Sequence, residues 1–107
     1  MKFEVRTTPG AEADVAEIHD WIDLVQGRPK EAARWLAGFL KAVDSLHQFP
    51  ERCPLAPESR SFAAEVRQLL FHRHRILFVI EGNEVRLIRV RHASRRPASE
   101  AELGMDG

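Results

Sequence analysis

The side chains best suited to binding and catalysis are the arginines and histidines in the second half of the chain. Residues 59–96 contain nine arginines, three glutamates and no lysine, a net charge of +6 in a chain whose formal charge is zero. The planar guanidinium group of arginine binds phosphates and carboxylates through paired hydrogen bonds. This basic block therefore indicates a site for a polyanion or an acidic peptide, and the alternative is a sheet face solvated by long arginines.

A β-hairpin is predicted within this block. Residues 74–81 and 85–92 have the apolar and β-branched composition of strands. Gly82-Asn83 lies between them and favours a tight two-residue turn. Since such a turn fixes the register of the two strands, the facing residues can be written out from the sequence.

This register places Arg75 and His92 on one face of the hairpin. Counting outward from the turn, Phe78 faces Leu87 and Arg75 faces Val90, so Arg75 and His92 become diagonal neighbours. A cation beside an imidazole is a candidate phosphate site with a proton donor. A slip of one residue would separate the pair, and the alternative is two exposed side chains on a solvated face.

Alternation along the strands assigns the other side chains to two faces. The face expected to meet the helices carries Ile76, Phe78, Ile80, Val85 and Leu87, with Arg89 and Arg91 at its far end. The outer face carries Leu77, Val79, Ile88 and Val90, together with Arg75, Arg86 and His92.

The remaining segments predict the elements that carry this hairpin. Residues 1–7 and 65–71 have the pattern of strands, and residues 9–27 and 29–47 have the three- and four-residue apolar spacing of helices. The apolar stripe of the second helix comprises Ala33, Leu36, Leu40, Val43 and Leu46, with Trp35 and Phe39 alongside. The order β-α-α-β-β-β predicts an α+β fold in which an N-terminal helical hairpin packs on one face of an antiparallel C-terminal sheet.

Domain organisation and compartment follow from composition. Residues 1–97 are expected to form one domain, and residues 98–107 an acidic, flexible tail. The chain has a single cysteine, no run of the ~18 apolar residues that a membrane span needs, and no signal peptide layout at residues 1–9. These features predict a cytoplasmic protein that does not bind membranes. No motif for a metal or a cofactor is present, so neither is expected.

Taken together, these segments resemble the RelE/ParE toxin superfamily over roughly residues 3–97. The likeness to that family's last three strands lies in EVRQLLFHRHRILFVIEGNEVRLIRVRHASRRP. The likeness to its helical hairpin and the following loop lies in DVAEIHDWI and AARWLAGFLKAVDSLHQFPERCP. The resemblance implies the toxin of a type II toxin–antitoxin pair, held inactive by a cognate antitoxin.

The resemblance implies three alternative modes of action. ParE-like members block DNA gyrase and perform no chemistry, and RelE-like members cut mRNA on the ribosome without a metal. An inactive member would only bind its antitoxin and regulate its operon, with operator DNA contacted through the antitoxin. The chain has no tyrosine, its pI is about 7.0, and His74 stands where RelE-like nucleases often have tyrosine. These departures favour a gyrase-directed or other non-nuclease toxin over the rival ribonuclease. The sequence leaves both an enzyme and a non-enzymatic toxin open.

Site residues follow from the resemblance and from the register. In a ribonuclease, Arg75 would lie near the scissile phosphate and His92 would act as acid or base. Cations expected to bind phosphate or the target are Arg67, Arg91, Arg95 and Arg96. The outer sheet face is expected to bind the antitoxin through Leu77, Val79, Ile88 and Val90.

Overall fold

The computed structural model describes residues 2–103 and has the predicted order of elements. The N-terminal half comprises β1 (Glu4–Thr7), α1 (Pro9–Asp20) and α2 (Pro29–Asp44). The C-terminal half comprises β2 (Arg67–Phe71), β3 (His74–Glu81), β4 (Glu84–His92) and the short α3 (Glu100–Leu103). The predicted α+β fold with a helical hairpin and three consecutive C-terminal strands is therefore confirmed.

One four-stranded sheet organises the molecule, with strand order β1-β4-β3-β2. The three C-terminal strands are antiparallel, and β1 joins the edge of β4 in parallel, so the sheet is mixed. β1 and β2 run in the same direction, because both are parallel to β4. The helical hairpin between them is long enough to return the chain to the end of the sheet at which both strands begin. Beyond β1, α1 continues along the edge of β4, where the Asp14 carboxylate accepts the Val90 N–H at 2.9 Å.

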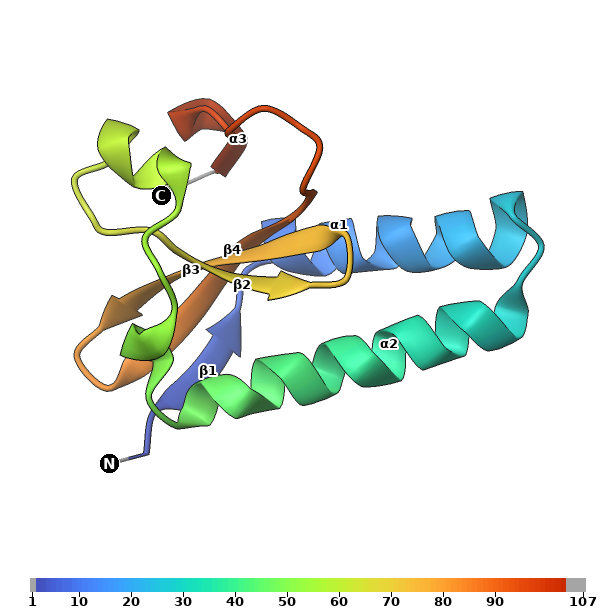
Figure 1. Cartoon of the computed structure of the whole chain (residues 1–107), viewed down its shortest axis with the longest axis horizontal. Coiled ribbons are helices and arrows are strands. Elements are labelled where there is room, and N and C mark those ends of the chain that lie inside the picture. Colours follow the sequence, from blue (N-terminus) through green and yellow to red (C-terminus); the bar gives the residue numbers. More distant parts are fainter. Residues whose placement is uncertain (1, 104–107) are drawn as a thin grey trace.

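Local sequence explains the helical hairpin. Thr8 caps α1, since its Oγ1 accepts the Ala11 N–H at 3.3 Å, and Pro9 occupies the first turn. α1 runs directly into a π-helical turn, Trp21–Val25, and Gly27 ends the segment with φ +64°. The end of the hairpin projects beyond the sheet (Figure 1).

The apolar stripe predicted for residues 29–47 is buried only in part. Ala32, Trp35 and Phe39 of α2 and Leu46 of the following 3-10 turn are buried, and Leu36 and Val43 are partly buried against the core. Leu40 is 57% exposed and Ala33 is exposed. Trp35 stacks on Phe39 with ring centroids 5.4 Å apart, and both contact Phe71 of β2. Aromatic rings bury a large apolar area, which favours turning the side of the helix that carries Trp35 and Phe39 toward the sheet.

The other face of the sheet is covered by the chain itself. Ala56 and Val66 on one side, and Ala98 and Leu103 on the other, form a second core with sheet residues Leu77, Val79 and Ile88. This cover lies across the sheet from α2 (Figure 1). We call residues 98–103 the C-terminal strap.

The strap corrects the expected boundary between domain and tail. A flexible segment was predicted from residue 98 onward, yet Ala98 and Leu103 are only 4% and 3% exposed. Their packing on the sheet makes residues 98–103 part of the domain, and residues 104–107 of the predicted tail lie outside the described residues. No helix within residues 2–103 has the length and apolar character required to cross a membrane.

Candidate functional site

A β-bulge in β4 changes which residues share a face. The predicted register holds from the turn to the pair Phe78–Leu87, after which Ile88 is inserted without a partner. Arg75 therefore faces Arg91 instead of the predicted Val90. The expected Arg75–His92 neighbourhood is wrong: the bulge reverses the alternation and sends the two side chains to opposite faces.

Arg75 lies on the outer face, in a buried ion pair. Its guanidinium donates to both carboxylate oxygens of Glu58 at 2.8 Å and to Gln68 Oε1 at 3.1 Å. Glu58 is 1% exposed and also accepts the Ala98 N–H at 2.9 Å. Burial by itself raises the pKa of the Glu58 carboxyl, but the hydrogen bonds from Arg75 and Ala98 outweigh it and leave the pKa below its ordinary value.

Three of the four cations expected to bind phosphate are engaged within the chain. Arg91 is 4% exposed and donates to the Arg96 carbonyl at 2.9 Å, while Arg67 donates to the Cys53 carbonyl at 2.7 Å. Arg96 lies 3.0 Å from Glu102 Oε1. Of this set only the exposed Arg95 has a side chain without a partner among residues 2–103.

Glu102 holds the C-terminal strap to these arginines. It lies 3.4 Å from Arg91 and accepts the Ser99 N–H at 3.0 Å, in addition to pairing with Arg96. The hydrogen bond from the Ser99 backbone, together with the two arginines, lowers the pKa of Glu102 to about 2. Charge on the outer face is therefore balanced by the chain's own carboxylates.

His92 lies on the helix side of the sheet, opposite His74. The two rings meet edge to face with centroids 5.3 Å apart, and His74 in turn packs against Trp35. Burial, followed by the neighbouring His92 and His72, lowers the pKa of His74. The Ser94 N–H donates to His92 Nδ1 at 3.1 Å, so the proton of the neutral His92 ring lies on Nε2.

A groove opens between this end of the sheet and the end of the helical hairpin. It has a volume of about 820 Å³, and its lining includes His74, His92 and Arg73 from the sheet and Trp21, Leu24 and Val25 from the π-helical turn. A smaller hollow of about 190 Å³ adjoins it and shares His74 and His92 with it. We call the larger cavity the hairpin groove.

The exposed apolar residues of the hairpin groove were missed in the sequence. One buried apolar stripe, ending at Val25, was expected for the helix over residues 9–27. In the π-helical turn, however, Trp21, Leu24 and Val25 are 55%, 73% and 63% exposed. The available signal was the run WIDLV, which places apolar side chains on more than one side of a helix and so exceeds what a single buried stripe needs.

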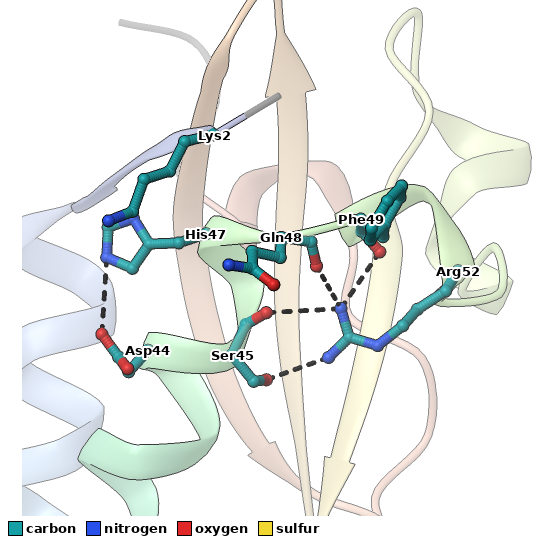
Figure 2. Close-up of a pocket in the computed structure, with 7 residues that line it drawn as sticks. All are labelled: Lys2, Asp44, Ser45, His47, Gln48, Phe49 and Arg52. Carbon is teal, nitrogen blue, oxygen red and sulfur yellow. Dashed lines mark hydrogen bonds and ion pairs between the residues drawn. The ribbon is translucent and has the colours of Figure 1, made fainter.

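A second hollow, of about 600 Å³, lies at the end of α2 (Figure 2). Arg52 crosses it and donates to the carbonyl oxygens of Ser45, Gln48 and Phe49 at 3.4, 2.8 and 3.0 Å. The Ser45 and Phe49 carbonyls also accept the backbone N–H groups of Gln48 and Arg52, at 3.3 and 3.1 Å, so the guanidinium adds a further donor to each of them. Arg52 therefore holds together the segment that follows α2, and the hollow has a structural explanation.

The residues expected to bind an antitoxin are inaccessible in this conformation. Leu77, Val79 and Ile88 are at most 2% exposed beneath the C-terminal strap and residues 56–66. Val90 is 5% exposed and belongs to the core on the helix side, because it follows the bulge. The expected outer binding face is a second hydrophobic core.

Comparison with known proteins gives one family and two similar structures. Residues 5–97 match the sequence model of the ParE toxin of the type II toxin–antitoxin system parDE. The fold is similar to a chain of the chromosomal ParDE system from P. aeruginosa, with a TM-score of 0.70 and 21% identity over 87% of this chain and 98% of that one. It is also similar to a chain of the RelBE2 toxin–antitoxin complex from Mycobacterium tuberculosis, with a TM-score of 0.55 and 23% identity over 88% and 95% of the two chains. No curated protein matches this chain in sequence.

Proposed function

Because this chain belongs to the ParE toxin family of type II toxin–antitoxin systems, we propose that it inhibits growth by binding DNA gyrase and performs no chemistry on RNA. The observation that carries this proposal is the buried Arg75–Glu58 pair. The carboxylate of Glu58 occupies the two donors that a phosphate would need.

Releasing Arg75 for a phosphate would be costly. The Glu58 side chain is fully buried, so moving the guanidinium away would leave a carboxylate without its charge partner in the core. Arg75 therefore supports the fold more readily than it supports a reaction.

The position of His92 also argues against a ribonuclease. Acid–base catalysis requires the proton donor and the phosphate-binding cation to converge within hydrogen-bond reach of the same reacting atoms. Arg75 and His92 point to opposite faces of the sheet, and the bulge that separates them is part of the fold.

An antitoxin completes the proposed function. The family and the two similar structures come from toxin–antitoxin systems, and we infer that a cognate antitoxin encoded with this chain neutralises it in the cytoplasm. Operator DNA would be contacted through that antitoxin.

The test is to induce the chain alone in cells and follow the incorporation of labelled thymidine and methionine over the first minutes. Thymidine incorporation is expected to fall first. Both His92→Ala and the double variant Glu58→Leu/Arg75→Met, which removes the whole buried pair, are expected to stay toxic.

Two other outcomes would overturn the proposal. If methionine incorporation collapses first and His92→Ala restores it, the chain is a RelE-like ribonuclease. If the folded protein accumulates and growth is unaffected at every dose, the chain is an inactive member that serves only its antitoxin and operon.

A further inference from the structure

The arginines of the basic block differ in whether their charge is already neutralised. Six of the nine have a carboxylate oxygen within 4.0 Å. Within residues 2–103, Arg60, Arg73 and Arg95 lack such a partner. Arg73 lines the hairpin groove and Arg95 lines the hollow that adjoins it. Unneutralised positive charge therefore gathers at this end of the sheet.

The helical wall of the same groove ends in exposed apolar residues, which follow the acidic Glu17 and Asp20. Trp21, Leu24 and Val25 lie within one π-helical turn, and each has more than half of its surface accessible. Single exposed apolar residues are ordinary, but a contiguous group lining one groove marks an interaction surface. Exposed leucines elsewhere, such as Leu40 on α2 and Leu70 on β2, stand on separate elements.

We propose that the hairpin groove is the docking surface for an acidic, amphipathic segment of the antitoxin. This inference rests on the proposed function, since it names the surface through which the partner of that function binds. Apolar anchors of the segment pack on Trp21 and Leu24, and its carboxylates pair with Arg73 and Arg95. The combination of an apolar wall and a cationic wall selects this chemistry over a purely apolar or purely acidic partner.

The charges around the groove also fix the orientation of the segment. Glu17 and Asp20 line the α1 side, so carboxylates of the partner are repelled there and must face the sheet. On the sheet side, His92 Nε2 carries the ring proton and has no partner among the described residues, so it can donate to a carboxylate of the segment. The segment thus lies with its acidic edge along the ends of β3 and β4.

The experiment compares matched substitutions inside and outside the groove. The toxin is purified as a complex with the protein encoded by the adjoining reading frame, separated from it in denaturant, refolded and titrated with that protein. Leu24→Glu is paired with Leu40→Glu, an exposed leucine on the outward side of α2. Arg73→Glu is paired with Arg60→Glu, another arginine without a carboxylate partner among residues 2–103.

Leu24→Glu and Arg73→Glu are each expected to weaken binding by about 30-fold or more, as truncation of a hot-spot residue does. The two controls should change the Kd by less than about threefold. Urea unfolding of all four variants establishes that they are folded. In a Trp35→Phe background, antitoxin binding should also shift the emission of Trp21 to shorter wavelength, because the exposed ring becomes buried.

Other outcomes separate the failure of this inference from the failure of the proposed function. If the wild-type chain binds no antitoxin, the proposed function fails and this inference fails with it. If all four variants bind as tightly as the wild type, the antitoxin uses another surface and the proposed function stands. If Leu24→Glu leaves antitoxin binding intact but converts a dimer of the free chain into a monomer, a second copy occupies the groove and the inference is overturned.

Discussion

Arg73 and Arg75 are two residues apart in the sequence, yet they stand in the two contrasting regions of the molecule. Arg75 lies under the C-terminal strap on the outer face, 7% exposed and paired with a buried glutamate. Arg73 lies in the turn between β2 and β3, exposed at the rim of the hairpin groove. The outer face uses its arginines to hold the chain together, whereas the groove leaves charge available to a partner.

The difference shows that the carboxylates decide what the arginines do. Glu58 and Glu102 come from outside the basic block and neutralise its outer face. No carboxylate of residues 2–103 reaches Arg73 or Arg95. A count of arginines along the sequence identifies a basic segment, but only the acidic residues around each one distinguish structure from recognition.

The largest expected effect comes from breaking the outer face. Arg75→Ala should lower the free energy of unfolding by about 3–5 kcal/mol, because it leaves the Glu58 carboxylate buried without its partner. Glu58→Leu/Arg75→Met should regain part of that loss, since an apolar pair replaces the ion pair while the Ala98 N–H loses its acceptor. Urea denaturation measures both, and equal stability of Arg75→Ala and the wild type would contradict a structural role.

Removing the C-terminal strap should have the next largest effect. A chain ending at Pro97 lacks Leu103, which is 3% exposed, and should lose about 2–3 kcal/mol of stability through exposed apolar surface. Thermal unfolding of the truncated and full chains gives the difference, with Leu103→Ala as a partial version of the same change. An unchanged midpoint would mean that the strap does not stay on the sheet in solution.

Acid should weaken the outer face to a smaller extent. The pKa of Glu58 is below 4.5, so its pairing stabilises the fold above that pH, and the stabilisation is lost as the pH falls through the lower folded value. Urea midpoints between pH 7 and pH 3 should therefore fall more steeply for the wild type than for Glu58→Leu/Arg75→Met. If the urea midpoints of the two proteins fall equally with pH, Glu58 is not the source of the acid sensitivity.

Titration of the Glu102 carboxyl tests the response of the C-terminal strap to acid at a single residue. Its chemical shift should titrate with a midpoint at about 2 instead of 4.5, because the Ser99 N–H and the neighbouring arginines stabilise the charged form. NMR of the side-chain carboxyl measures this directly, and Arg96→Ala, which removes one of these arginines, is the matched variant that should raise the midpoint. A midpoint near 4.5 in the wild type would show that the strap is released.

The smallest expected effect lies at the hairpin groove. Arg73→Ala and Arg95→Ala should each change the free energy of unfolding by less than about 0.5 kcal/mol, since neither side chain has a partner to lose within residues 2–103. Urea denaturation of these two variants and of Arg75→Ala compares the stability contributions of the groove and of the outer face. A loss of more than about 1 kcal/mol would mean that these arginines also support the fold.

Local pattern predicted much of the fold. The order of elements, the Thr8 cap, the Gly82-Asn83 turn and the first four pairs of the β3–β4 hairpin all follow from short-range preferences of the backbone. The candidate site was not predictable in the same way, because it depends on the bulge at Ile88. One inserted residue reverses the alternation of side chains between the two faces of the sheet, and nothing in the composition of the strand indicates it.

The sequence by itself determined a single α+β domain with an arginine-rich sheet and a likeness to one toxin superfamily. It did so because periodicity and turn chemistry act between neighbours in the chain. Tertiary structure alone decided that Arg75 pairs with Glu58, that His92 faces α1 and that residues 98–103 cover the outer face. These outcomes depend on charges and apolar surface brought together from distant parts of the chain, where burial makes an unpaired carboxylate or an uncovered sheet face unfavourable.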